Sequence, residues 1–472
     1  MAPARRPWMV VILFLPVLLA LLWTWTNGYE GVNGQDAHDY WRIAREWTAY
    51  WAGGGRPVIA EHPHGYPMAA AVLGAVMGDE LVGLRVVSAL SLLILVFSLR
   101  WVLSRFSEER GPLLAFTLLA VAACPFLLRY GMMSMSDVPG TALIFMTYIM
   151  LAQWQQGKGR WSLFGAVVFA GLAMTVRMAV APLIGALVLA IIHGEQEGRC
   201  RRWTWVIGAT VAVLVVVLTV LSSYELEGLI HGSPLAEWSP LNLFRRVLHS
   251  DDGVLVYRVP NIVYVLGIFV HPGFLPMGIL LLPFFRKADL FTVPVRMATW
   301  CVGCYLLFIA GMPFQNDRVL LMALPFVAVL LYPAFQRAWA WSAVRGLRPA
   351  LWVSAMALVQ VGLFARAIQP FMDQARTERE LANEVNDLHP EWIYTHGMGA
   401  AFINYCGPVP VTELWYGVID TFEQGAIVVV KPQNLIEQWN GLPPGINWQR
   451  IQQQGADSIG WHVDGWVISR IR

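Results

Sequence analysis

The chain leaves its first long apolar run through the sequence Gly34-Gln35-Asp36-Ala37-His38-Asp39-Tyr40-Trp41-Arg42-Ile43-Ala44. Two carboxylates, a histidine and a tyrosine lie close together in this stretch. A carboxylate costs several kcal/mol in the hydrocarbon core of a bilayer, so the stretch must occupy the headgroup region or a water-filled cavity. We therefore expect a functional aqueous loop directly after a membrane-spanning helix.

The composition places the chain in a membrane. Hydrophobic residues make up 57% of it, charged residues only 14%, and the mean hydropathy is +0.53. A soluble domain carries about 25% charged residues. The net charge of +2 and the lack of a basic patch with interleaved aromatic residues give no support for nucleic-acid binding.

The cysteines and the N-terminus give two further expectations. The five cysteines are scattered, and the pair Cys301 and Cys304 lies inside an apolar run, where packing is the expected role rather than metal or redox chemistry. Arg5 and Arg6 precede an apolar run long enough to span a bilayer, and no small-x-small cleavage site follows it. We expect a retained first span with a cytoplasmic N-terminus.

Apolar runs predict about eleven spans, at residues 8–26, 81–103, 112–128, 138–155, 161–176, 178–193, 204–223, 261–285, 296–312, 319–336 and 350–368. Every second connection is rich in Arg and Lys, as cytoplasmic loops are. The first loop, residues 27–80, and the C-terminus are then extracytoplasmic. The first loop is expected to hold a helix at 39–51, and Pro272 and Pro276 predict a kink or an interfacial helix within 261–285.

The chain changes character after the last apolar run. Residues 371–472 are polar, with a helical start at 378–388 and strand-like runs at 392–395, 427–430 and 466–471. We expect a small extracytoplasmic α/β domain there, after a transmembrane domain at 1–370. The predicted fold class is thus an α-helical polytopic membrane protein with a small C-terminal α/β domain.

Asp36 is the leading candidate for acid–base chemistry. An aspartate at an aqueous interface has an ordinary pKa of about 3.9 and is ionised, so it can accept a proton. Its position at the junction of loop and helix also suits an N-cap. Asp39 shares a helix face with it, and a solvated helix face explains Asp39 adequately.

Two further acidic or imidazole clusters have alternative interpretations. The run Glu61-His62-Pro63-His64-Gly65-Tyr66-Pro67 has donors for a divalent metal, for a substrate contact, or simply for a Pro/Gly-rich turn. Asp137 directly precedes a predicted span, where it is either an N-cap with Pro139 near the helix start or a second site carboxylate facing Asp36.

Several arginines lie in outer segments or at outer ends of spans. Arginine suits bidentate phosphate binding, although an arginine at a span end also extends to the interface for solvation alone. We favour Arg177 and Arg318 as phosphate ligands. The full set is Arg85, Arg129, Arg177, Arg245, Arg246, Arg258 and Arg318.

The order of these motifs resembles the GT-C superfamily of membrane glycosyltransferases, in particular glycosyltransferase family 39 with its protein mannosyltransferase and lipid A aminoarabinose transferase relatives. Residues 36–46 are similar to the acidic first-loop motif of that family, except that Ala37 stands where Glu is usual. The other similar segments, in chain order, are 64–67, 84–90, 136–137, 171–177 and 318–325.

The resemblance implies transfer of a sugar from a polyprenyl- or dolichyl-phosphate carrier to a lipid, glycan or protein acceptor on the outer face of the membrane. It implies Asp36 as general base and Asp137 as a second catalytic-site carboxylate. No cofactor is required, and a divalent metal at His62 and His64 is not favoured. The implied substrate-binding residues are Asp39, Tyr40, His62, His64, Tyr66, Arg85, Arg177 and Arg318.

Two other functional classes share part of the pattern. A transporter or flippase of a lipid-linked sugar would share the apolar spans and the phosphate-binding arginines, but it would need no carboxylates in two outer loops. The absence of an internal repeat also speaks against a transporter. A non-catalytic scaffold with an outer recognition domain is the third class.

Overall fold

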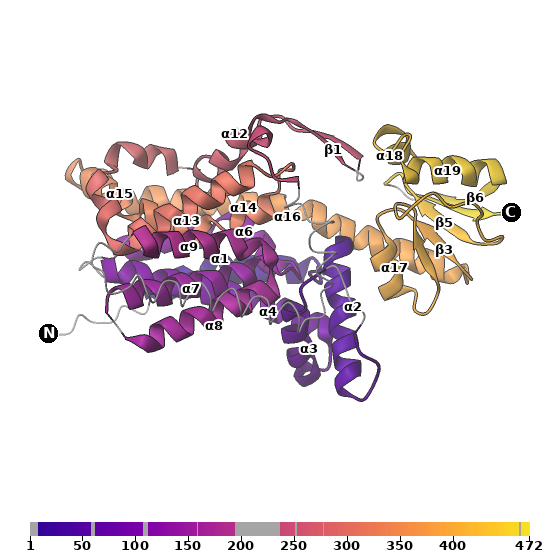
Figure 1. Ribbon diagram of the computed structural model, residues 1–472, viewed down its shortest axis with the longest axis horizontal. Coiled ribbons are helices and arrows are strands. Elements are labelled where there is room, and N and C mark those ends of the chain that lie inside the picture. The colour runs from indigo at the N-terminus through magenta and orange to yellow at the C-terminus, as the bar shows by residue number, and fades with distance from the viewer. Residues whose placement is uncertain are drawn as a thin grey trace. The chain divides into compact units, whose positions relative to one another are not determined.

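The structure is a computed structural model that describes residues 8–57, 62–106, 112–157, 159–193, 237–250, 253–276, 278–461 and 464–472. The chain divides into two compact units (Figure 1). The helical unit comprises Met1–Glu30, Ile43–Phe244 and Pro260–Ile368, and the sheet unit comprises Gly31–Arg42, Arg245–Val259 and Gln369–Arg472. The predicted fold class, mostly helical with a small C-terminal α/β region, is confirmed.

Helices of very different lengths form the helical unit. They are α1 (Trp8–Thr26), α3 (Gly65–Met77), α4 (Glu80–Phe106), α5 (Pro112–Ala122), α6 (Pro125–Met132), α7 (Asp137–Gln155), α8 (Arg160–Val176), α9 (Ala181–His193), α12 (Asn261–Leu266), α13 (Val293–Ala310), α14 (Asp317–Leu321) and α15 (Leu324–Val344). Two helices have residues in both units, α2 (Gly34–Trp51) and α16 (Pro349–Asp387).

Among the described residues, three helices are long and apolar enough to cross a membrane, namely Glu80–Arg105, Val293–Ala310 and Pro349–Asp387. A fourth span is possible if α5 and α6, bent by 59° at their junction, count as one. The predicted span 204–223 lies outside the described residues. The expected number of spans and the side of the membrane on which each loop lies therefore stay predictions.

The structure corrects three local expectations. Residues 261–285 form no continuous span, because prolines divide them into α12 and the short 3₁₀ turns Gly267–Phe269 and Gly278–Phe284. The first loop contains α3 in addition to α2. Since α2 begins at Gly34 rather than at residue 39, Asp36 lies in its first turn and is not its N-cap.

The break between α5 and α6 is closed by a loop from later in the chain. The carbonyl oxygen of Gly273 accepts hydrogen bonds from the Phe126 amide, at 3.0 Å, and from Cys124 Sγ, at 3.0 Å. In an apolar environment a broken helix needs such partners for its freed backbone groups. A Cβ at Gly273 would meet the ring of Phe126 at 2.5 Å, so a larger residue there would have to displace that ring.

The sheet unit has a five-stranded sheet in the order β4-β3-β5-β7-β6. Its strands are β3 (Ile393–Thr395), β4 (Val411–Glu413), β5 (Ile427–Val430), β6 (Ala456–Trp461) and β7 (Val467–Ile471), and its other elements are α17 (Gly399–Tyr405), α18 (Pro432–Glu437), α19 (Pro443–Gln454) and the hairpin β1 (Val247–Ser250) to β2 (Gly253–Val256). Strands β4, β3 and β5 are parallel, and β7 is antiparallel to both β5 and β6. The carboxyl ends of β3, β4, β5 and β6 therefore lie at one edge.

Both faces of this sheet are buried, as the continuous apolar run of β5 indicates. Ile427 and Val429 pack on one face with α16 and α17, whereas Val428 and Val430 pack on the other with α18 and α19. The alternation follows from the two-residue period of a strand. The result is an α/β domain with helices on both sides, visible in Figure 1.

Helices α3 and α4 approach closely where α4 carries Gly83. A Cβ at Gly83 would collide with the carbonyl oxygen of Ala70 and lie 2.9 Å from the amide nitrogen of Gly74. We predict that Gly83→Ala destabilises the protein by about 1–3 kcal/mol, because backbone atoms cannot yield as a flexible side chain can. Thermal unfolding of the purified protein in detergent measures this loss.

The matched control is Gly303→Ala on α13, where a Cβ would meet nothing within 4 Å. It should leave the unfolding temperature unchanged or raise it slightly. Equal effects of the two substitutions would show that the α3–α4 contact is looser than described.

Candidate functional site

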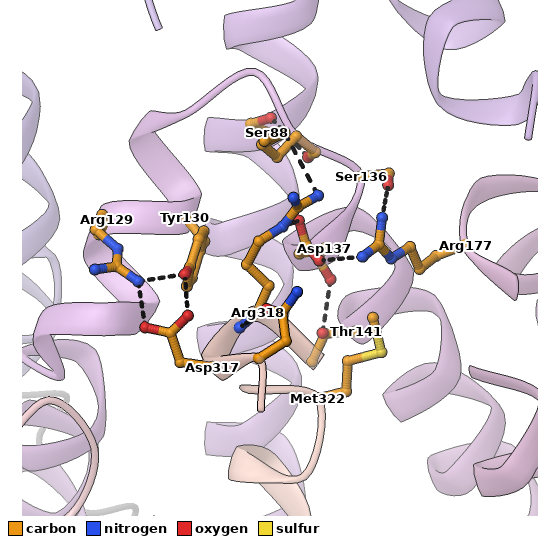
Figure 2. A network of polar contacts seen from close by, with 12 residues as sticks. Ser88, Arg129, Tyr130, Ser136, Asp137, Thr141, Arg177, Asp317, Arg318 and Met322 are labelled. Carbon is orange, nitrogen blue, oxygen red and sulfur yellow. Dashed lines mark hydrogen bonds and ion pairs between the residues drawn. The ribbon is translucent and has the colours of Figure 1, made fainter. Parts of the chain in front are cut away.

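An ion-pair cluster lies within the helical unit and is centred on Asp137, the first residue of α7 (Figure 2). Its carboxylate is fully buried and lies between two guanidinium groups. Arg177 Nη2 is 3.1 Å from Oδ1, and Arg318 Nε is 3.2 Å from Oδ2. The side chains of Arg177 and Arg318 are 15% and 18% exposed, so each reaches the surface of the cluster.

The local backbone fixes both arginines. Arg177 follows α8 in an extended conformation, which ends that helix, and its Nη1 donates to Ser136 Oγ at 3.4 Å. Arg318 lies in the first turn of α14, where its amide donates to the N-cap side chain of Asn316 at 2.9 Å. Asp137, Arg177 and Arg318, all predicted from the sequence, thus come together.

A second ion pair flanks this cluster (Figure 2). Asp317, the neighbour of Arg318, accepts from Arg129 Nη2 at 2.6 Å and from the Tyr130 hydroxyl at 2.6 Å. Arg129 and Tyr130 are buried on α6. The sequence indicated Arg129 as a candidate but not Tyr130 or Asp317, for which the one signal was the acidic–basic pair 317–318 in a short polar turn.

The charges of these side chains do not cancel. The guanidinium groups of Arg129, Arg177 and Arg318 face the carboxylates of Asp137 and Asp317. Among these five residues the positive charges therefore exceed the negative ones by one. A net positive, partly exposed site with apolar walls attracts an anionic group.

In the sheet unit, the segment that carries Asp36 is held by two buried carboxylates. Glu378 on α16 accepts from the Gly34 amide at 2.9 Å and lies 3.0 Å from His38 Nε2. Glu413, at the end of β4, accepts from Gln35 Nε2 at 2.5 Å. The amide of Asn404 donates to the His38 carbonyl at 2.8 Å and faces Nδ1 at 3.2 Å, so Nε2 carries the proton that is donated to Glu378.

Asp36 itself lies half-buried between these anchored neighbours. Residues 34, 35 and 38 are each hydrogen-bonded to later parts of the sheet unit by the contacts above, so the first turn of α2 is fixed on both sides of Asp36. A half-buried carboxylate on a rigid turn is suited to accept a proton from a bound group.

Glu413 has an unusual environment for an acidic residue. Besides Gln35, it accepts from the amides of Gly397 at 2.9 Å and Gly399 at 2.5 Å. Burial nevertheless outweighs these hydrogen bonds and raises the pKa of the Glu413 carboxyl.

The remaining predicted residues lie elsewhere. Asp39 pairs with Arg42 at 3.2 Å, Tyr40 is fully buried, and the sheet-unit arginines Arg245, Arg246 and Arg258 flank the hairpin. In the helical unit Arg85 on α4 is half-buried. His62, which precedes α3, is also half-buried, and Glu61 lies outside the described residues.

His64 and Tyr66 make contacts that hold helices together. Trp47 Nε1 donates to His64 Nδ1 at 3.1 Å. The Tyr66 hydroxyl donates to the Leu84 carbonyl at 3.1 Å and contacts Ser88 Oγ at 2.9 Å. In the part of the chain that the structure describes, no group of three His, Cys, Asp or Glu residues is arranged to hold a metal.

Comparison with known proteins agrees with the fold. Residues 61–222 match the family model of the dolichyl-phosphate-mannose-protein mannosyltransferases. No curated protein matches the chain.

Solved structures extend the likeness to the whole chain. ArnT from Cupriavidus metallidurans in the apo state matches with a TM-score of 0.64 and 15% identity, over 98% of this chain and 97% of that one. ArnT bound to undecaprenyl phosphate gives 0.63 and 16%, over 99% and 98%. The arabinofuranosyltransferase AftD from Mycobacteria gives 0.50 and 12%, over 99% of this chain and 40% of that one. The predicted resemblance to the GT-C superfamily is confirmed.

We predict that Asp137→Ala destabilises the protein by about 3 kcal/mol, because it leaves two guanidinium groups without their shared buried partner. The double variant Asp137→Ala/Arg177→Met should lose less than the sum of the single variants, by at least about 1 kcal/mol. Unfolding of the four proteins in detergent measures this coupling. Strict additivity would show that the pair does not stabilise the cluster.

We also predict an unusual pH dependence at Glu413. Because burial favours its neutral form, the folded protein keeps this proton to higher pH than the unfolded chain, whose carboxyl ionises near 4.5. The stability that Glu413 contributes is therefore full below that pH and is lost as the pH rises through the raised folded pKa. The difference in unfolding free energy between wild type and Glu413→Gln should shrink as the pH rises from 4.5 to 7.5.

Asp457→Asn provides a control, since the hydrogen bond and charge of Arg472 lower the pKa of Asp457 from its usual 3.8. The stability that this group contributes is present above that pH, so the effect of Asp457→Asn should stay nearly constant from pH 4.5 to 7.5. A Glu413 difference that is flat or increasing over the same range would contradict the assignment.

Proposed function

We propose that this protein is a glycosyltransferase that moves a sugar from a polyprenyl-phosphate carrier to an acceptor hydroxyl on the outer face of the membrane. One observation carries the proposal: a partly exposed, net-positive arginine cluster centred on buried Asp137 lies within an apolar helical unit. Such a site suits a phosphate group attached to a hydrocarbon chain, because the chain can lie among apolar helices. The match of the fold to a protein bound to undecaprenyl phosphate supports it.

Arg177 and Arg318 are the proposed ligands of the donor phosphate. Each guanidinium group contacts Asp137, and the planar fork geometry of arginine suits bidentate binding of a phosphate. Negative charge accumulates on this phosphate as the bond to the sugar breaks. Fixed guanidinium groups stabilise that charge without reorganisation during the reaction.

Asp137 has a different role from a proton acceptor in this proposal. It is fully buried and both of its oxygens face guanidinium groups, so it orients the two arginines. It also limits their mutual repulsion when no phosphate is bound. The expected second catalytic carboxylate is therefore proposed as a positioning residue.

Asp36 is the proposed general base. As the acceptor oxygen forms its bond to the anomeric carbon, Asp36 takes the hydroxyl proton, the bond from that carbon to the phosphate oxygen breaks, and the electron pair leaves with the polyprenyl phosphate. A phosphate held by arginines is a good leaving group, so the step requires no strong general acid. Neither a cofactor nor a metal is part of the proposed reaction.

Replacement of Asp36 tests the proposal. We predict that Asp36→Asn lowers sugar transfer at saturating donor by about a hundredfold or more, since Asn retains the shape of Asp but cannot take the proton. Transfer from a radiolabelled polyprenyl-phosphate sugar by the protein in membranes measures the rate, and binding of the same donor should be unchanged.

Asp420→Asn makes the same chemical change on the exposed surface of the sheet unit, where Asp420 pairs with Arg450, and should transfer at the wild-type rate. Full activity in Asp36→Asn would assign the base to another carboxylate. If wild type releases no sugar from the donor but moves the intact donor lipid across the bilayer, the protein is a transporter instead.

A further inference from the structure

A cavity of ≈ 280 Å³ opens at the carboxyl edge of the sheet, entirely within the sheet unit. Gly397 follows β3, Lys431 follows β5, and Asp464 and Trp466 belong to the turn between β6 and β7. Asp373 and Glu378 on α16 form the opposite wall. The crevice outside the carboxyl ends of parallel strands is the usual ligand position in open α/β sheets.

The lining combines charged groups of both signs with an aromatic face. The Lys431 ammonium lies 5.1 Å from the centre of the Trp466 ring. Asp464 Oδ2 accepts from Thr377 Oγ1 at 2.7 Å, which fixes the carboxylate at the cavity rim. Gly397 has φ +81°, a backbone conformation that favours glycine, and a Cβ there would extend into open space.

These groups select the chemical class of the ligand. Asp373 pairs with Arg376 at 3.3 Å, but Glu378 and Asp464 still outnumber Lys431 among the lining residues. An anion is therefore disfavoured, and an apolar ligand would desolvate charges without compensation. A polyhydroxyl ligand fits, because its hydroxyls donate to carboxylates and accept from the ammonium while its C–H face covers the indole. The volume is close to the lower bound of about 300 Å³ for small-ligand pockets, which suits a single sugar unit.

Glu378 connects this cavity to the proposed base. The same carboxylate that lines the cavity accepts from the Gly34 amide at 2.9 Å and pairs with His38 at 3.0 Å, on either side of Asp36 in sequence. A ligand in the cavity thus shares a wall residue with the turn that carries Asp36.

We infer that this cavity binds a terminal sugar unit of a glycan acceptor, whose hydroxyl is then presented to Asp36. The inference rests on the proposed glycosyl transfer and names its acceptor class. Lys431, Asp464 and Trp466 are the proposed acceptor-binding residues, and the acceptor is a carbohydrate rather than a protein side chain.

Binding of neutral sugars tests the cavity without any donor. Saturation-transfer NMR on the full-length protein in detergent, with a panel of methyl hexosides and methyl pentosides, should give a signal with at least one glycoside. The affinity should fall about tenfold in Lys431→Met and in Asp464→Asn, each of which removes a charged hydrogen-bonding group. Asp457→Asn, a charge change at the exposed pair with Arg472, should bind as wild type does.

Trp466→Phe and Trp466→Ala separate stacking from folding. The Phe variant should retain most of the binding and the Ala variant should lose it, with unfolding temperatures reported for both. A wild-type protein that binds no glycoside of the panel, or binding that survives Lys431→Met and Asp464→Asn together, would overturn the inference.

Kinetics distinguish this failure from a failure of the proposed function. With the glycoside that binds as acceptor, Lys431→Met should raise the acceptor KM about tenfold and change kcat much less. Slow release of sugar to water from the polyprenyl-phosphate donor reports the transfer chemistry without an acceptor. Donor cleavage with no glycoside binding would retain the proposed function and reject the acceptor site. Glycoside binding with no donor cleavage would retain the sugar site and reject the proposed function.

Discussion

A charge inside an apolar bundle must have a partner, and the helical unit meets this constraint at Asp137. Its carboxylate receives Arg177 from the end of α8 and Arg318 from the start of α14, so residues far apart in the chain meet at one buried group. Asp317 does the same for α6 by accepting from Arg129 and Tyr130. The short helix α14 therefore fixes its neighbours through two consecutive residues of opposite charge.

The sheet unit follows the same logic with different groups. Two carboxylates, Glu378 and Glu413, accept from the backbone and side chains around Asp36, and both are almost fully buried. An acid so enclosed is costly unless its oxygens are satisfied, which is why the hydrogen bonds cluster there. These hydrogen bonds fix the first turn of α2, in which Asp36 is the half-buried acidic residue.

The sequence was sufficient for features that depend on local composition. Hydropathy and charge depletion indicated a polytopic helical protein, and the run Ile427–Val430 indicated a strand. Arg177 and Arg318 stood out because a charged side chain next to an apolar run is costly and is usually paired or functional. The contacts that hold Asp36 were not predictable, since Glu378 and Glu413 lie 344 and 378 positions from their partners Gly34 and Gln35. Pro272 and Pro276 predicted an interruption within 261–285, but hydropathy did not show how short the helical turns there are, because an apolar run has the same average whether or not it is helical.

The central claim is that the arginine cluster assists the breaking of a bond between a sugar and a lipid phosphate. The most direct measurement reconstitutes the purified protein in liposomes with a polyprenyl-phosphate sugar and a hydroxyl acceptor, and quantifies free polyprenyl phosphate and glycosylated acceptor by mass spectrometry. We predict that the two products appear in equal amounts, and that neither appears when a nucleotide sugar replaces the lipid donor. Glycosylation from the nucleotide sugar, or an intact lipid donor that only changes leaflet, would contradict it.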